Sequence, residues 1–218
     1  MISCVRNLSV LVFLMGCGDG ALGDQDILSI GDSLLDFHAP DADIATVAGS
    51  ALGLDVEHGA VGGTTMLGGD SIPDSYVDGS FSLLIASGGG NDFGECGCDG
   101  GCDEVLDDLL SEDGTEGAIA VLVDRAVGDG KSVIWVGYLR PMDDAEEFSD
   151  CDAELDVYRE RLSALDAREA AMVFVDGATI GTGSEDELYE PDGYHPSEAG
   201  SLALGEAAAN QASAAFGL

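Results

Sequence analysis

Basic residues are scarce in this sequence, which has seven Lys and Arg against 43 Asp and Glu and a formal net charge of −36. Lys131 is the only lysine. Nucleic acid and anionic lipid surfaces would repel such a chain, so neither is an expected partner. The acidic residues are spread along the chain, which indicates a solvated surface; a cation-binding surface is the alternative. A saline habitat would account for this charge, because salt screens the repulsion between like charges.

Signatures of nucleotide binding and of repeat architecture are also missing. No Gly-x-Gly-x-x-Gly turn follows the first predicted strand, so the phosphate cradle of a Rossmann-type site is absent. No internal repeat of solenoid length occurs. The 218 residues are enough for one sizeable domain and too few for two comfortable ones.

The apolar run near the N-terminus, Leu8–Met15, is too short to span a bilayer as a mature helix. It follows Arg6, and this order is typical of an export signal. The overlapping stretch Leu14–Cys17, "LMGC", resembles a bacterial lipobox, although Met15 is unusual within such a box. We therefore expect residues 1–16 to be a cleaved signal peptide and Cys17 to be lipidated.

Ordinary cleavage after Ala21–Gly23 is the alternative to lipidation at Cys17. In either case the mature protein leaves the cytoplasm. The lipobox predicts a lipoprotein of the bacterial cell envelope, and ordinary cleavage predicts a periplasmic or extracellular protein. Residues 17–25 would form a short linker before a single domain at 26–218.

Export makes the remaining cysteines informative. Outside the leader and Cys17 there are four, namely Cys96, Cys98, Cys102 and Cys151. An even number in an oxidising compartment predicts two disulfides, with three possible pairings. The cluster "CGCDGGC" could instead bind a soft metal. However, it lacks the two separated Cys-x-x-Cys pairs of a zinc ribbon, and no histidine lies near it.

Strand-like and helix-like segments alternate along the chain. Five short apolar runs predict strands, at residues 26–30, 54–58, 81–87, 131–139 and 171–176. Apolar residues at helical spacing predict helices at residues 41–53, 103–110, 115–127, 151–170 and 196–216. This alternation predicts an α/β/α sandwich with a five-stranded parallel sheet. Functional sites in such sheets gather at the carboxyl ends of the strands, where several polar and glycine-rich segments fall here.

Ser33 follows the first predicted strand, in "GDSL". The simplest interpretation is that Asp32 or Ser33 caps a helix beginning at Leu34. A serine at this place could equally be a nucleophile, since its hydroxyl is exposed at the sheet edge and the helix amides favour developing negative charge. The choice depends on whether a base and an oxyanion site can be found.

His195 is the best candidate base among the three histidines. Asp192 lies three residues before it, in a turn that precedes a predicted helix. The aspartate can there bind the imidazole Nδ1 and fix the tautomer, which leaves Nε2 to accept the serine proton. A surface turn is the simpler interpretation of this short motif. His38 and His58 have no comparably placed carboxylate, and we expect structural or surface roles for them.

Two segments could hold an oxyanion. Asn91 comes just after the third predicted strand, and its side-chain amide could donate a hydrogen bond to the oxyanion. Gly63 lies in the loop after the second predicted strand, where no side chain would block its N–H. The alternative is that Asn91 is an ordinary turn residue and Gly63 an ordinary glycine of a flexible loop.

Taken together, four segments resemble the motif blocks of the SGNH, or GDSL, hydrolases, in the family's order. These are "GDSL" (Gly31–Leu34), the loop around Gly63, "GGND" (Gly89–Asp92) and "DGYHP" (Asp192–Pro196). The resemblance spans nearly the whole mature chain. The second block is looser, because His58 stands where asparagine is common, and this leaves a choice between Gly62 and Gly63. The "CGCDGGC" insert is not a general feature of the family.

The resemblance implies that residues 26–218 are an SGNH hydrolase domain with Ser33 as the nucleophile, His195 as the general base and acid, and Asp192 as the orienting carboxylate. The Ser33 and Gly63 N–H groups and the Asn91 side chain would form the oxyanion hole. No metal or organic cofactor is implied. The implied activity is ester hydrolysis, on a lipid or an acylated carbohydrate. A catalytically idle binding or structural protein of the same fold is the alternative.

Overall fold

The computed structural model describes residues 26–94, 96–98, 101–145 and 147–218. The predicted signal peptide 1–16, the lipidation site Cys17 and the linker 17–25 lie outside the described residues. Those predictions therefore stay predictions.

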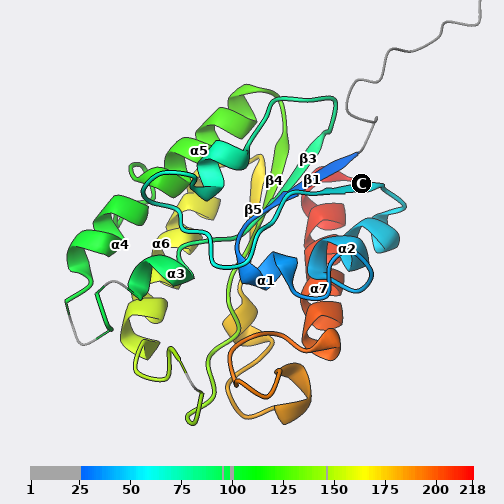
Figure 1. Ribbon diagram of the computed structural model, residues 1–218. Coiled ribbons are helices and arrows are strands. Elements are labelled where there is room, and N and C mark those ends of the chain that lie inside the picture. Colours follow the sequence, from blue (N-terminus) through cyan, green and yellow to red (C-terminus); the bar gives the residue numbers. More distant parts are fainter. Residues whose placement is uncertain (1–25, 95, 99–100, 146) are drawn as a thin grey trace, which may run out of the picture.

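Five strands form one parallel sheet in the order β2-β1-β3-β4-β5 (Figure 1). The predicted five-stranded parallel sheet is thus confirmed. The first three strands along the chain are β1 (Ile27–Ile30), β2 (Val56–His58) and β3 (Leu83–Ala86), and the last two are β4 (Ser132–Val136) and β5 (Met172–Val175).

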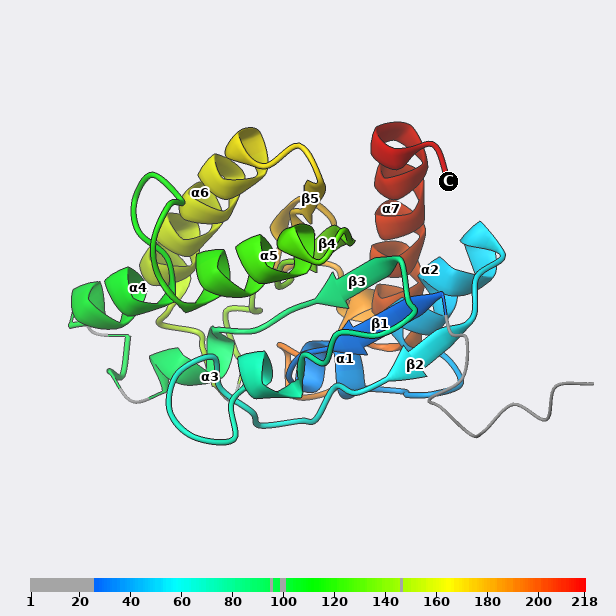
Figure 2. The same cartoon turned by 90° about the horizontal axis from the view of Figure 1, so that it is seen from above.

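Helices cover both faces of the sheet, as Figure 2 shows from above. Helices α4, α5 and α6 pack on one face, and α1, α2 and α7 pack on the other. The helix bounds are α1 (Ser33–Asp36), α2 (Ile44–Leu52), α3 (Gly90–Phe93), α4 (Asp103–Leu109), α5 (Ala118–Gly128), α6 (Asp152–Arg168) and α7 (Glu198–Phe216). In the part of the chain that the structure describes, 3₁₀ turns at Ile72–Ser75, Gly177–Thr179 and Asp186–Leu188 lie in the connections.

The central strands are buried on both sides because each face of the sheet carries its own core. Along β3, Leu84 belongs to the core under α5 and α6, whereas Leu83 and Ile85 belong to the core under α7. Trp135 of β4 is fully buried. This two-sided burial explains why these strands are continuously apolar rather than alternating.

The carboxyl edge of the sheet collects the segments that the sequence singled out. Helix α1 follows β1 and α3 follows β3 at this edge, and the turn before α7 lies at the same end of the molecule (Figure 1).

Most helix predictions are confirmed to within a few residues. Helix α3 was missed, because "GGGND" was interpreted only as a glycine-rich segment after the strand.

The four cysteines form two disulfides, as predicted. Cys96 pairs with Cys102, six residues away, and Cys98 pairs with Cys151, 53 residues away. The longer bridge ties the segment after α3 to the start of α6, so it connects the regions that follow β3 and β4. All four sulfurs are engaged in these bonds, which resolves the choice between disulfides and metal binding by the cluster.

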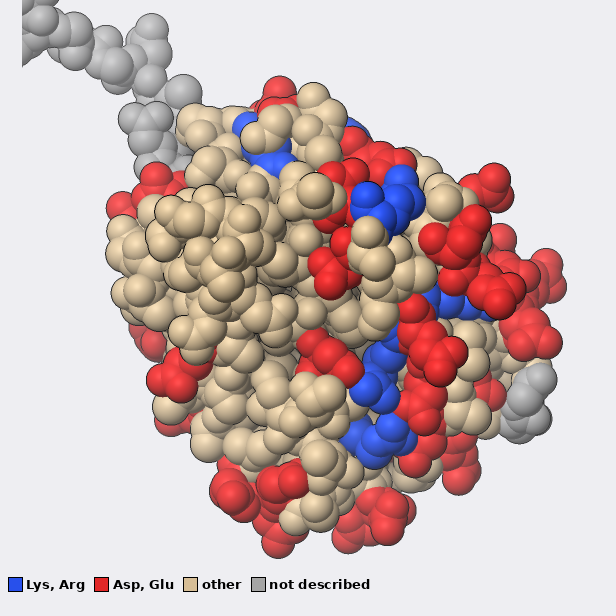
Figure 3. Space-filling model, turned by 180° about the vertical axis from the view of Figure 1, so that it is seen from behind, with Lys and Arg blue, Asp and Glu red and all other residues tan. Residues whose placement is uncertain are grey.

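On the face shown in Figure 3, acidic side chains gather along the rim and on the right-hand side, and the basic side chains there lie among them. Several arginines form ion pairs with aspartates, as in the group of Arg140, Arg159, Asp152, Asp156 and Asp176. With 43 acids and seven basic residues in the sequence, most acids can have no cationic partner in the chain. Among the described residues, no helix combines the length and apolar character needed to cross a membrane.

Candidate active site

Ser33 is the first residue of α1, and it is not the residue that caps the helix. Asp32 performs the capping: its Oδ1 accepts a hydrogen bond from the Leu34 N–H at 3.0 Å. The Ser33 hydroxyl therefore does not cap the helix. It lies at the carboxyl end of β1, at a helix N-terminus where backbone N–H groups favour negative charge.

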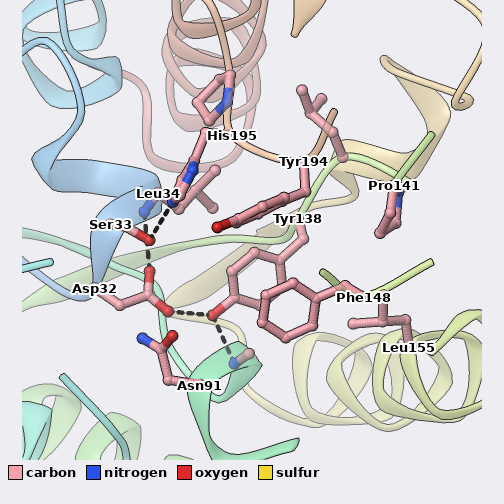
Figure 4. Close-up of a pocket in the computed structure, with 13 residues that line it drawn as sticks. Asp32, Ser33, Leu34, Asn91, Tyr138, Pro141, Phe148, Leu155, Tyr194 and His195 are labelled. Carbon is pink, nitrogen blue, oxygen red and sulfur yellow. Dashed lines mark hydrogen bonds between the residues drawn. The ribbon is translucent and has the colours of Figure 1, made fainter. Parts of the chain in front are cut away.

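The structure brings together the three residues predicted to form a triad. The Ser33 Oγ lies 2.9 Å from His195 Nε2 (Figure 4), although the two residues are 162 positions apart in the sequence. On the other side of the ring, His195 Nδ1 lies 2.8 Å from Asp192 Oδ2. An ionised carboxylate accepts the Nδ1 proton, which leaves Nε2 as the acceptor for the serine proton.

The turn before α7 holds Asp192 in this position. Its Oδ1 accepts hydrogen bonds from the backbone N–H groups of Tyr194 at 3.1 Å and His195 at 3.0 Å. Burial alone would raise the pKa of Asp192, but the hydrogen bonds from His195 and Tyr194 outweigh it and hold this pKa below its usual value. Asp192 is therefore a carboxylate at neutral pH.

Two aromatic rings fix the orientation of the His195 imidazole. The Phe37 ring stacks on it with a centroid separation of 4.1 Å, and the Tyr194 ring lies 4.2 Å away at a tilt of 38°. His38 also serves this region, since its Nε2 lies 3.2 Å from both the Pro196 carbonyl and Glu190 Oε1. The expectation of a structural role for His38 agrees with these contacts.

The "GGND" segment anchors the glycine loop near Ser33. The Asn91 side chain donates from Nδ2 to the Thr64 carbonyl at 2.8 Å. Asp92, which is buried, accepts hydrogen bonds from the Met66 and Leu67 N–H groups, both at 2.9 Å. An amide NH₂ has two hydrogens, so Asn91 keeps a second one for the pocket that it shares with Ser33.

The glycine loop distinguishes between Gly62 and Gly63 as backbone donors. The Gly62 N–H already donates to Asp36 Oδ2 at 2.9 Å. Within the described part of the chain, no acceptor within hydrogen-bonding geometry meets the Gly63 N–H. Gly63 also has a φ of 80°, a left-handed conformation that favours glycine. Of the two, Gly63 is the one with an N–H available to an oxyanion, although it is not among the residues that line the pocket.

A buried polar network lies behind Ser33. Asp32 is 1 % exposed, and its Oδ2 accepts a hydrogen bond from the Tyr138 hydroxyl at 2.5 Å. The same hydroxyl accepts a hydrogen bond from the Gly90 N–H at 2.8 Å. Burial raises the pKa of Asp32, and the hydrogen bonds from Tyr138 and the Leu34 N–H oppose that rise. Tyr138 thus joins the residue before Ser33 to the residue before Asn91.

A small pocket opens next to Ser33 and His195 (Figure 4). Its cavity volume is about 40 Å³. Besides the polar groups described above, its walls are apolar and aromatic: Leu34, Tyr138, Leu139, Pro141, Phe148, Leu155, Tyr194 and Pro196. The site can therefore place a small apolar group beside the serine hydroxyl.

Sequence reasoning missed several of these residues. Tyr138 lies two residues beyond the end of β4, but the predicted strand at residues 131–139 included it. Phe37 lies four residues after Ser33, about one helical turn, which is the spacing at which side chains share a helix face. We find no sequence signal for the pocket role of Phe148.

No protein-family model matches the sequence, and no curated protein matches it. Solved structures do resemble the fold. A carbohydrate esterase family 2 enzyme from Myceliophthora fergusii matches 92 % of this chain and 69 % of its own, with 18 % identity and a TM-score of 0.64. A protein from Slackia heliotrinireducens assigned to the SGNH hydrolases matches 84 % of this chain and 96 % of its own, with 18 % identity and a TM-score of 0.60.

A variant of the acetyl-xylooligosaccharide esterase Axe2 from Geobacillus matches 84 % of this chain and 91 % of its own, with 19 % identity and a TM-score of 0.56. All three similarities span most of this chain at low sequence identity, so they bear on the fold. The sheet order, the helix layers and these similarities agree: the chain has the fold of the SGNH (GDSL) hydrolases.

Proposed function

We propose that this chain is a serine esterase of the SGNH hydrolases that cleaves carboxylic esters through an acyl-enzyme intermediate. One observation carries the proposal: a continuous hydrogen-bonded series runs from Asp192 through His195 to Ser33 at the wall of a pocket. A serine that only began a helix would need neither the imidazole nor the carboxylate behind it.

Acylation follows from the positions of these atoms. The Ser33 Oγ attacks the ester carbonyl carbon while His195 Nε2 takes the hydroxyl proton, and Asp192 stabilises the imidazolium. The tetrahedral intermediate collapses as the bond to the alcohol oxygen breaks. His195 returns its proton to that oxygen, so the alcohol leaves neutral and the acyl group stays on Ser33.

Deacylation repeats the sequence with water. His195 accepts a proton from a water molecule, whose oxygen attacks the acyl carbon. The bond to the Ser33 Oγ then breaks, the serine regains its proton from His195, and the carboxylic acid is released. No metal or organic cofactor takes part in this scheme.

Three donors would hold the oxyanion in both steps: the backbone N–H groups of Ser33 and Gly63 and the side chain of Asn91. Their support is the free Gly63 N–H, the second Asn91 hydrogen and the position of Ser33 at a helix N-terminus. Removal of one oxyanion donor typically costs ~10²–10³ in rate. Asn91→Ala should therefore be a severe variant, and Asn91→Asp should be no better because it adds like charge.

We infer that the substrate carries a short acyl group. A cavity volume of about 40 Å³ exceeds the roughly 10–15 Å³ that one water needs, so it can take a few heavy atoms but no long chain. One protein of similar fold is an acetyl-xylooligosaccharide esterase, and another is a carbohydrate esterase. An acetylated carbohydrate is accordingly the preferred substrate class, and a long-chain lipid is the alternative.

The competing candidate is a binding or structural protein with an idle site, favoured by the unusual cysteine insert and the anionic surface. The hydrogen bonds that align Asp192, His195 and Ser33 weigh against it.

The two disulfides favour an oxidising compartment, which supports export of the protein. We further propose lipidation at Cys17, which metabolic labelling with a palmitate analogue tests: a Cys17→Ala variant should carry no label.

Hydrolysis of p-nitrophenyl acetate tests the enzyme proposal. Wild type should turn it over, whereas Ser33→Ala and His195→Ala should each lose nearly all activity while remaining folded. The double variant should be little worse than either single one, because triad members act as a unit. Ser80→Ala, at an exposed serine, is the matched control and should keep full activity. Retention of most activity in Ser33→Ala would refute the site assignment.

A further inference from the structure

One wall of the pocket comes from the segment between β4 and α6. Phe148 of this segment lines the pocket together with Leu155 of α6, and Figure 4 shows both side chains at the side opposite the serine. The Phe148 ring lies edge-on to Tyr194, with a centroid separation of 5.3 Å. Tyr194 in turn packs against the His195 ring. Phe148 is therefore two side-chain contacts away from the catalytic base.

The backbone of Phe148 is held in an unfavourable conformation. Its φ is 65°, in the left-handed region, where a bulky residue other than glycine is rare. Such conformations persist only where the surrounding structure imposes them. A constraint must therefore hold this residue with its ring against the pocket.

The longer disulfide is joined to Phe148 through a turn. The Phe148 carbonyl accepts a hydrogen bond from the Cys151 N–H at 2.9 Å, which closes a tight turn between the two residues. Cys151 is bonded to Cys98 in the segment after α3. Both cysteines are buried, at 5 % and 8 % exposure. The disulfide thus links the turn covalently to the segment after α3.

The other disulfide has a different position. Cys96 and Cys102 close a loop within a single segment, six residues apart, and neither lines the pocket. Cys98 and Cys151 do not line the pocket either, but Cys151 is hydrogen-bonded to the pocket residue Phe148, whereas neither cysteine of the shorter bridge is. The shorter bridge is a built-in control for the longer one.

We propose that Phe148 limits the length of the acyl group that the site accepts, and that the Cys98–Cys151 disulfide holds Phe148 in that position. This rests on the proposed esterase function. The walls around Phe148, formed by Leu139, Pro141 and Leu155, are apolar. They suit a hydrocarbon acyl chain better than the hydroxyl-rich alcohol of a sugar, so this pocket is the acyl side of the site. Loss of the ring or of its anchor opens the pocket to longer chains.

The test compares kcat/KM for p-nitrophenyl acetate, butyrate and octanoate with the purified mature chain. A pocket typically discriminates by 10–200-fold for one methylene, so Phe148→Ala should raise the butyrate-to-acetate ratio by roughly tenfold or more. Phe148→Trp should lower that ratio. Paired serine substitutions at Cys98 and Cys151 should raise it in the same direction as Phe148→Ala.

The paired substitutions Cys96→Ser and Cys102→Ser are the control and should leave the ratio near that of wild type. Circular dichroism establishes whether each variant is folded. The Phe148 variants retain both disulfides, so they still test the role of Phe148 if a cysteine variant does not fold. An unchanged ratio in an active Phe148→Ala protein would refute the role of Phe148. A folded Cys98/Cys151 variant with the wild-type ratio would refute the role of the disulfide. A wild type inactive on all three esters would instead refute the proposed function itself.

Discussion

Tyr138→Phe is a single-atom change at the centre of the site. It deletes the hydroxyl that donates to Asp32 at 2.5 Å and accepts from the Gly90 N–H at 2.8 Å. The ring stays, so no large cavity forms. The variant leaves one buried carboxylate oxygen and one buried N–H without this partner. The polar network, and not the packing, is what the substitution tests.

The loss of stability can be estimated from the two bonds. At a pH where Asp32 is ionised, its hydrogen bond from Tyr138 contributes about 1.5–3 kcal/mol, and an orphaned buried donor costs about 1–3 kcal/mol. Since relaxation recovers part of both, we expect a destabilisation on the order of 2–4 kcal/mol. For a domain of this size that corresponds to a lower Tm by about 5–15 °C. Calorimetry measures this directly.

The pH dependence of this loss gives a sharper readout. Tyr138 opposes the burial that raises the pKa of Asp32, so its removal raises that pKa further. The penalty is therefore largest where Asp32 is ionised in the wild type, and it shrinks as the pH falls and Asp32 becomes protonated in both proteins. Urea unfolding at a series of pH values would reveal this convergence.

Catalysis should suffer as well, because Asp32 precedes Ser33 and Gly90 precedes Asn91, two residues of the proposed site. A small displacement of either group lowers kcat by about 10–100-fold, with KM changed little. The matched control is Tyr76→Phe, which removes a hydroxyl that donates to Asp129 at 3.0 Å, from another buried tyrosine. It should destabilise the fold without lowering kcat. Equal kcat values for Tyr138→Phe and wild type, or a stability loss independent of pH, would refute this reasoning.

Three further outcomes are expected. Asp192→Asn should lower kcat by up to ~10⁴, since the tautomer of the base is no longer fixed. Because the pKa of Asp192 is lowered in the folded protein, its contribution to stability is present at neutral pH and is lost as the pH falls through that pKa. The free energies of unfolding of variant and wild type, measured in urea, should therefore converge at strongly acidic pH. Tm should rise by many degrees from low to molar sodium chloride, given the net charge of −36, and a flat response would contradict the repulsion argument. Loop-closure entropy assigns a stabilisation of about 4 kcal/mol to the Cys98–Cys151 bridge and about 2 kcal/mol to the Cys96–Cys102 bridge. The paired serine variant that lacks Cys98–Cys151 should therefore unfold at the lower denaturant concentration.

The sequence was most informative where chemistry and topology coincide. The carboxyl-edge rule and the four motif blocks placed Ser33, Asn91 and His195 in one region, and the structure brings Ser33 and His195 into hydrogen-bond contact. The strand prediction for residues 131–139 was too long, and this hid Tyr138. The strand ends at Val136, and Gly137 lies so close to Phe174 that an added Cβ would come within 2.7 Å of its ring. Apolar periodicity does not report such a contact.

Other features depend on information that local sequence does not carry. Helix α3 has only four residues, which is too short for propensity to specify; tertiary contacts from Asn91 and Asp92 hold it instead. The position of Phe148 depends on which cysteines pair, and four cysteines allow three pairings. The proposed anchoring of Phe148 could therefore be inferred only once the Cys98–Cys151 bond was known.

Covalent labelling of the nucleophile tests the central claim most directly. Folded wild-type protein treated with a fluorophosphonate should gain one adduct in its intact mass, and peptide mapping should place that adduct on Ser33. The Ser33→Ala variant should gain none, and His195→Ala should react far more slowly because the serine has lost its base. A folded wild type that takes up no probe, or an adduct that persists in Ser33→Ala, would contradict the assignment of Ser33 as the nucleophile.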